Sequence, residues 1–179
     1  MALAGASVVA GTLAIPIMDS DGKYYALHKD NVMTRAYNLG TQVLIFAEEL
    51  RRLCKIHGYN FPGLFAQAWH ETAGFTSALW NRARNPAGLK NTSAKAYQRY
   101  YNGVDAARGF VVHMSAYVPG RTKPALNDYR FLDSRVAVAE KANKGRTFYT
   151  MDDLAGFWAE DPMYGREILK TYKGLFGEI

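Results

Sequence analysis

The sequence predicts an α+β fold that is mainly helical, with one small irregular β or loop region. Apolar residues recur at helical spacing along most of the chain, whereas residues 78–102 lack that period and contain turn-forming pairs such as Asn85-Pro86. A length of 179 residues, 49% of them hydrophobic and 21% charged, is typical of one globular domain with a real core.

Residues 1–30 are predicted to form an N-terminal arm or hairpin appendage to a main domain over residues 31–179. Residues 1–18 are small and apolar, residues 19–22 are turn-forming, and residues 23–27 could return as a hairpin strand. The first basic residue is Lys23, so the basic region of a secretory signal is missing, and a membrane span needs about 20 apolar residues. An arm that packs on the domain or on a partner is the better interpretation.

The helical pattern divides the rest of the chain at glycines and prolines. Gly40 interrupts a long pattern that stops at Gly58, and Thr150 with Asp153 approximates a capping box. Helices are expected over residues 32–57, 62–74, 104–118, 129–143, 150–158 and 161–176.

Glu71 lies at the end of the helix expected between Pro62 and Gly74. At 100° per residue, Leu64, Ala68 and Glu71 fall near one line along this helix, so the carboxyl group ends a mostly apolar stripe. Desolvation and the negative end of the helix dipole would both disfavour its charged form. A carboxyl group that stays partly protonated near neutral pH is what acid catalysis of glycosidic cleavage requires. The spacing is equally compatible with a surface glutamate at a frayed helix end.

The charge balance favours an anionic partner. The formal net charge is +6 and the pI is near 9.4, which fits nucleic acid, anionic lipid or the acidic polymers of a bacterial wall. The basic residues are scattered and no nucleic-acid-binding motif is present, which argues against specific nucleic-acid binding. Cys54 is the only cysteine and the four histidines lack metal-ligand spacing, so the sequence predicts no disulfide within the chain, no metal and no cofactor.

Four segments, taken in order, resemble the glucosaminidase family of peptidoglycan hydrolases, glycoside hydrolase family 73, which has a lysozyme-like helical fold. Residues 66–77 (AQAWHETAGFTS) are similar to the family's AQAxxETGxGxS segment, and residues 85–90 (NPAGLK) to its NxxGIK segment. Residues 97–117 resemble its tyrosine-rich stretch and the helix that follows, including His113. Residues 157–165 (FWAEDPMYG) are similar to its WAxDPxYG segment. The resemblance covers roughly residues 40–176.

The resemblance implies hydrolysis of the β-1,4 bond after N-acetylglucosamine in peptidoglycan glycan strands, with Glu71 as the proton donor. Tyr164 matches the family's active-site tyrosine near the cleaved sugar. The substrate-binding residues that we predict are Gln67, Ser77, Trp80, Asn85, Tyr97, Tyr100 and Trp158. For the aromatic residues among them, packing in the core is the alternative.

Two departures from the family pattern affect this interpretation. Ala73 stands where the family has a glycine, so the exit from the helix is expected to differ. Many members carry a second carboxylate near the position of Asn102, which cannot act as a base; the nearest carboxylate is Asp105 at the start of a predicted helix. Three routes stay open: Asp105 as the base in an inverting reaction, the acetamido group of the substrate as the nucleophile, or a weakened enzyme.

Two other functions remain as alternatives. A lytic transglycosylase would use a single glutamate on the same substrate, and a wall-binding or virion structural protein would bind without catalysis. Because the first 18 residues do not look like a signal peptide, we expect delivery to the wall by a phage particle or release by a holin. Residues 1–30 are then expected to serve virion docking or self-assembly, without stable insertion in a membrane.

Overall fold

The computed structural model describes residues 14–91, 96–120, 122 and 126–178, and within these ranges the fold is mainly helical. The α-helices are α1 (Lys23–Asn38), α2 (Thr41–His57), α3 (Phe61–Glu71), α4 (Ala78–Ala83), α5 (Gly103–Met114), α7 (Val136–Asn143) and α8 (Tyr164–Phe176). Two 3₁₀-helices, η1 (Arg130–Leu132) and η2 (Met151–Leu154), flank α7. The β-structure in the described ranges consists of isolated bridges, so the mainly helical prediction is confirmed and a β lobe is not seen there.

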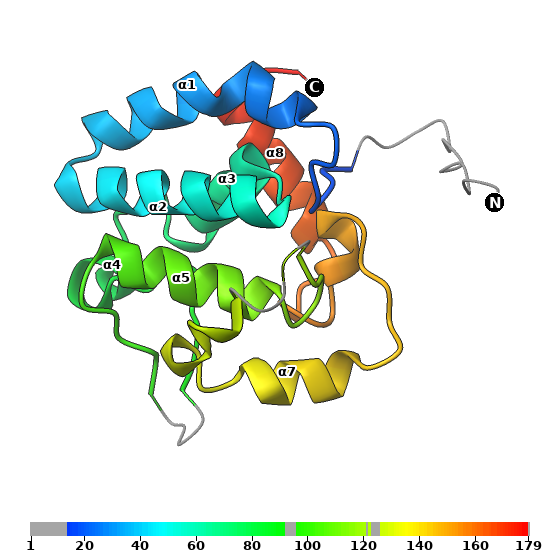
Figure 1. Cartoon of the computed structure of the whole chain (residues 1–179). Coiled ribbons are helices and arrows are strands. Elements are labelled where there is room, and N and C mark those ends of the chain that lie inside the picture. The colour runs from blue at the N-terminus through cyan, green and yellow to red at the C-terminus, as the bar shows by residue number, and fades with distance from the viewer. Residues whose placement is uncertain (1–13, 92–95, 121, 123–125, 179) are drawn as a thin grey trace, which may run out of the picture.

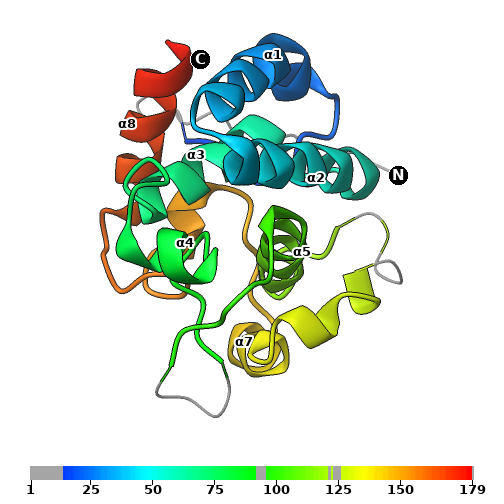
Figure 2. The same cartoon turned by 90° about the vertical axis from the view of Figure 1, so that its left-hand side faces the viewer.

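The helices stack in layers around one core. Figures 1 and 2 both show α1, α2, α5 and α7 one below another, with α3 and α8 packed together on one side. Close contact between α2 and α5 depends on Gly103, because a Cβ atom there would lie 2.5 Å from the backbone oxygen of Gln42. The fully buried Phe46 and Phe110 face each other across this contact, with ring centroids 6.3 Å apart.

The break between α1 and α2 occurs at Gly40, as the sequence predicts. Gly40 has a φ of 101°, which favours glycine, and α2 stops at Gly58 with a φ of 80°. The apolar face of α2 is buried from Val43 to Cys54, so hydrophobic periodicity located this helix correctly.

The hairpin predicted for residues 23–27 is wrong, because these residues form the first turn of α1. Both carboxylate oxygens of Asp19 accept backbone N–H groups from this turn, those of Tyr24 at 3.2 Å and Tyr25 at 2.9 Å. Ile15 and Ile17 are fully buried, and Ile17 bonds to the backbone of Tyr149 and Asn60. Residues 14–30 therefore pack into the body of the fold, while residues 1–13 of the predicted arm lie outside the described residues.

The later elements are shorter than predicted. The helix predicted for residues 104–118 spans Gly103–Met114, and the one for 129–143 divides into η1 and α7. The capping box of Thr150 and Asp153 is present, but the helix that it begins is the four-residue η2. α8 begins at Tyr164, three residues after Asp161, whose carboxylate accepts the backbone N–H of Met163 at 2.8 Å.

Candidate active site

Glu71 is the last residue of α3, a helix with a well-defined start. The side chain of Asn60 accepts the backbone N–H of Gly63 at 3.0 Å, and Pro62 occupies the first turn. Every residue from Phe61 to Ala68 is buried. The helix therefore runs through the core and carries Glu71 to its far end.

A left-handed turn follows Glu71. Ala73, Gly74 and Phe75 have φ values of 49°, 70° and 62°, so the bend includes Gly74 as predicted but begins one residue earlier. A left-handed residue that carries a side chain costs about 1–2 kcal/mol. The buried hydroxyl of Thr72 stabilises the turn, since it accepts the backbone N–H of Phe75 at 2.9 Å and donates to the carbonyl of Ala68 at 2.7 Å.

One oxygen of the Glu71 carboxyl group accepts two hydrogen bonds. The hydroxyl of Tyr164 donates to Oε1 at 2.6 Å, and the indole N–H of Trp158 donates to the same atom at 3.2 Å. Oε2 has no hydrogen-bond partner among the described residues. Since Oε1 is committed as an acceptor, a proton on neutral Glu71 belongs on Oε2.

The surroundings of Glu71 favour its neutral form. Burial raises the pKa of Glu71, and this effect outweighs the hydrogen bonds from Tyr164 and Trp158 and the nearby His70, which act to lower it. Burial, followed by the neighbouring carboxylate, raises the pKa of Tyr164 well above its ordinary value, so its hydroxyl remains a donor. This carboxyl group has a raised pKa, and its Oε1 already accepts two hydrogen bonds, so it can donate a proton from Oε2.

A hydrogen-bond chain from Gln67 on α3 through Tyr164 on α8 leads to the Glu71 carboxyl group. Gln67 lies one turn before Glu71 on α3, is fully buried, and donates from Nε2 to the hydroxyl of Tyr164 at 2.9 Å. Tyr164 is 3% exposed at the first position of α8. The packing of α3 against α8 thus brings together the sequence-predicted residues Gln67, Glu71 and Tyr164, and the segment before α8 adds Trp158.

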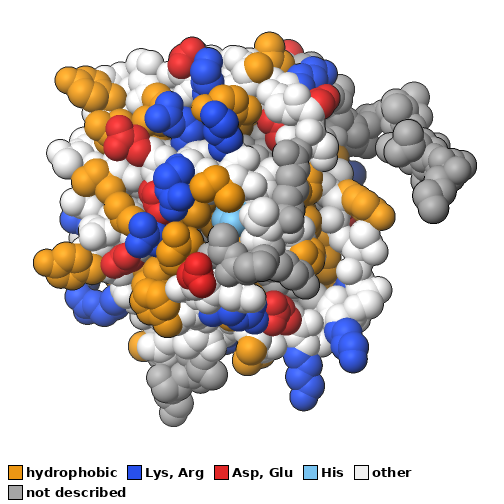
Figure 3. All heavy atoms as spheres, viewed as in Figure 1, with side chains coloured by type: hydrophobic (Ala, Val, Ile, Leu, Met, Phe, Trp, Pro, Cys, Tyr) orange, Lys and Arg blue, Asp and Glu red, His pale blue; other side chains and the backbone are white. Residues whose placement is uncertain are grey.

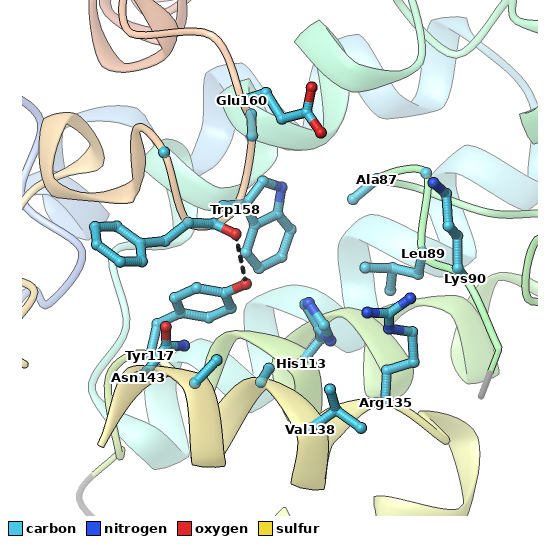
Figure 4. Close-up of a pocket in the computed structure, with 16 residues that line it drawn as sticks. Ala87, Leu89, Lys90, His113, Tyr117, Arg135, Val138, Asn143, Trp158 and Glu160 are labelled. Atoms are coloured by element: carbon cyan, nitrogen blue, oxygen red, sulfur yellow. Dashed lines mark hydrogen bonds between the residues drawn. The ribbon is translucent and has the colours of Figure 1, made fainter. Parts of the chain in front are cut away.

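A cavity of about 410 Å³ opens beside Trp158. One wall is the 87–90 segment, another is α7, and the third is the 156–160 segment that carries the indole (Figure 4). Figure 4 shows Lys90 and Arg135 on one side of this cavity and Glu160 on the other. The cavity therefore combines an aromatic wall with charged side chains of both signs, as a pocket for a polar ring would.

His113 lies on the floor of this cavity and is held by a buried carboxylate. Its Nδ1 is hydrogen-bonded to Oδ2 of Asp133, which is 2% exposed. The imidazole makes an edge contact with the Trp158 ring, with centroids 4.9 Å apart, and a tilted contact with Tyr117. One indole therefore contacts Glu71 through its N–H and His113 through its ring.

Two predicted sugar-stacking residues are in the core instead. Trp80 is 2% exposed and packs edge-on against Phe75, with ring centroids 4.9 Å apart. Tyr100 is 6% exposed and covers Gly109 so closely that a Cβ atom there would collide with its ring. This burial is unfavourable to stacking of Trp80 and Tyr100 on sugar, and their role in substrate binding stays a prediction.

Ser77 and Asn85 have local structural partners. The hydroxyl of Ser77 accepts the backbone N–H of Trp80 at 3.1 Å at the start of α4. The amide of Asn85 is 1% exposed, donates to the carbonyls of Leu89 and Gln98, and accepts the backbone N–H of Leu89. Its bonds order the turn, and contact of Asn85 with substrate stays a prediction.

Tyr97, by contrast, is half exposed and pairs through its backbone with Lys90 at the edge of the cavity wall. Its role in substrate binding stays a prediction. Residues 92–95, which join these two positions and belong to the hairpin region expected over 78–102, lie outside the described residues.

Asn102 and Asp105 begin α5. The side chain of Asn102 accepts the backbone N–H of Asp105 at 3.0 Å and so caps the helix. Asp105 lies about 140° around the helix from Phe110, the residue that packs against Trp158. The helix thus turns the Asp105 carboxylate away from the cluster around Glu71, which is unfavourable to a role for Asp105 as the base.

His113 in the cavity and its partner Asp133 were not predicted as site residues. They are separated by 20 residues in the sequence, and no spacing rule connects a residue on α5 with one after η1. His113 belongs to one of the four family-like segments, but its pairing with Asp133 depends on how α7 folds back beneath α5 (Figure 1).

The outer surface has no single basic patch on the face seen in Figure 3, where Lys and Arg side chains are interspersed with acidic and hydrophobic ones. Within the described ranges, no helix combines the length and the apolar character needed to cross a bilayer. The same ranges contain no group of three or more His, Cys, Asp or Glu side chains placed to hold a metal ion.

No family model matches this chain, and comparisons with curated proteins and with solved structures found no match.

Proposed function

We propose that this protein is a peptidoglycan hydrolase that cleaves the β-1,4 glycosidic bond after N-acetylglucosamine, with Glu71 as the general acid. The single observation that carries the proposal is the state of this carboxyl group. It is mostly buried, its pKa is raised by that burial, and Tyr164 and Trp158 both donate to Oε1. Oε2 then carries the proton that the departing sugar oxygen needs.

Further support comes from the residues around the acid. Trp158 forms a wall of the adjacent cavity and offers an aromatic face, which suits the apolar face of a sugar ring. The net charge of +6 suits an anionic polymer such as the bacterial wall. The order of the four family-like segments favours a lysozyme-like glucosaminidase.

The test is the analysis of products from purified peptidoglycan treated with wild-type protein and with Glu71→Gln. The glutamine keeps the size of the side chain and can accept both hydrogen bonds, but it has no acidic proton. We expect new reducing ends that carry N-acetylglucosamine with the wild type and none with the variant. Equal wall clearing by both proteins would refute catalysis by Glu71, and binding without product in both would favour a wall-binding or virion structural protein.

A lytic transglycosylase is the second candidate. It is favoured by Asn102, which occupies the expected carboxylate position and caps α5 instead of acting as a base. Such an enzyme would use Glu71 alone and leave an anhydro end. Mass spectrometry separates the two reactions, because the anhydro product is lighter by one water.

A further inference from the structure

We propose that His113, held by Asp133, is the general base of this enzyme. The inference rests on the proposed hydrolase function and supplies a second catalytic group, because Asn102 stands where many members of the resembled family carry a carboxylate. Its basis is the position of the pair: Asp133 is buried behind the imidazole, and the imidazole lies in the wall of the cavity beside Trp158.

The hydrogen bond to Asp133 fixes how His113 can act. Because Nδ1 is bonded to a carboxylate, which only accepts, the proton of the neutral imidazole is held on Nδ1. Nε2 is then left with a lone pair. The same arrangement of carboxylate and imidazole activates the base in other hydrolases, where the carboxylate stabilises the imidazolium that forms.

Asp133 is itself fixed in place. Its other oxygen, Oδ1, accepts the backbone N–H of Arg135 at 2.9 Å, and the carboxylate is almost completely buried. One carboxylate therefore orients both the imidazole and the start of α7. His113 lines the cavity, and Figure 4 shows its ring rising from α5 between Trp158 and Arg135.

A base that activates a water molecule implies an inverting reaction. Glu71 accepts the indole N–H of Trp158, and the imidazole of His113 contacts the ring of the same indole. Inverting glycosidases keep their two groups about 6.5–9.5 Å apart, which leaves room for the attacking water.

The reaction step balances with these two groups. A water oxygen bonds to the anomeric carbon while the bond from that carbon to the bridging oxygen breaks. The proton on Glu71 Oε2 goes to the departing oxygen, and a water proton goes to Nε2 of His113. Solvent then takes the proton from His113 and returns one to Glu71.

Other titratable and charged groups around His113 must be considered. Those that line the cavity with it, or act on Asp133, are Lys90, Tyr100, Tyr117, Arg130, Arg135 and Glu160. Glu160 is the competing base, because it is an exposed carboxylate on the opposite side of the cavity. The experiment must therefore separate His113 from Glu160.

The first measurement is the configuration of the product released by the wild type, followed by NMR during the first turnovers. An inverting route releases the α-anomer from a β-linkage. Release of the β-anomer would overturn the inference and leave the proposed hydrolase function standing. Absence of any reducing product from the wild type would overturn both.

The second measurement uses four full-length variants on purified peptidoglycan, with thermal unfolding as a check of folding. We expect His113→Gln and Asp133→Asn each to lower kcat at least 100-fold and to remove the acidic limb of the pH–rate profile. Asp133→Asn keeps the shape of the side chain, but its amide would donate to Nδ1 and move the imidazole proton to Nε2. If the hydrogen bond between His113 and Asp133 were only structural, both substitutions would lower stability and leave the shape of the pH–rate profile unchanged.

The controls are His57→Gln and Glu160→Gln. His57 is also a buried histidine with a side-chain hydrogen bond, between Nδ1 and the hydroxyl of Thr122, but it lies at the end of α2. His57→Gln should lose stability without changing kcat or the pH profile, and Glu160→Gln should keep the acidic limb of the pH–rate profile. Wild-type kcat in folded His113→Gln, or loss of the acidic limb in Glu160→Gln alone, would overturn the inference.

Discussion

Replacing Tyr164 with phenylalanine removes one hydroxyl that serves two partners. This hydroxyl donates to Glu71 at 2.6 Å and accepts from Gln67 at 2.9 Å, on a side chain that is 3% exposed. Loss of a buried hydrogen bond that leaves a partner unsatisfied costs about 1–3 kcal/mol. We therefore expect the free energy of unfolding of Tyr164→Phe, measured by urea denaturation, to fall by about 1–3 kcal/mol.

The same substitution should change the pH dependence of activity. The hydrogen bond from Tyr164 acts to lower the pKa of Glu71, so its loss raises that pKa further. Glu71 then stays protonated to higher pH, and the alkaline limb of the pH–rate profile is expected to move upward. The measurement is the rate of reducing-end release across the pH range.

Tyr172 provides a matched control on the same helix. It is fully buried in α8 like Tyr164, but its hydroxyl has no hydrogen-bond partner among the described residues. Removing an unsatisfied buried hydroxyl costs nothing, so Tyr172→Phe should be as stable as the wild type or more stable, with an unchanged pH profile. Equal destabilisation by both variants, or an unchanged pH profile in Tyr164→Phe, would refute the role given to the Tyr164 hydroxyl.

Two further predictions concern stability. Glu71→Gln should raise the free energy of unfolding at neutral pH by on the order of 1 kcal/mol, because active-site groups are often held at a cost to stability. The raised pKa means that the contribution of Glu71 to stability is complete below its unfolded-state pKa and is lost as the pH rises through the folded-state pKa. Unfolding curves of wild type and variant should diverge with increasing pH, and convergence would contradict this. Gly165→Ala should lose about 1–3 kcal/mol, because its Cβ would collide with Asp152. Gly174→Ala, which meets nothing within 4 Å, should gain about 0.5–1 kcal/mol, and similar melting temperatures for the two would refute the packing argument.

The helices with strong local signals could be predicted from the sequence. The break at Gly40, the stop at Gly58 and the entry at Pro62 each depend on the backbone freedom or restriction of one residue type. The first turn of α1 was misassigned because residues 19–22 satisfy turn chemistry and helix capping equally well. Only the packed structure shows that the Asp19 carboxylate accepts the first N–H groups of α1.

The candidate site was predictable in part for a similar reason. The environment of Glu71 followed from its position at the end of an apolar stripe, and the direction of its pKa shift agrees with that prediction. Whether an aromatic ring is free or buried depends instead on tertiary packing, which places Trp80 in the core and leaves Trp158 only partly buried. The pairing of His113 with Asp133 could not be predicted, since it requires the contact between two distant segments.

The position of Trp158 makes this side chain an internal fluorescence reporter. The other two tryptophans, Trp69 and Trp80, pack edge-on against Phe75. A sugar that enters the cavity would change the polarity around Trp158 alone, so a shift in emission on titration with a glycan fragment reports occupancy directly. Such a signal would follow ligand capture in Glu71→Gln, where no product forms and binding must be observed without turnover.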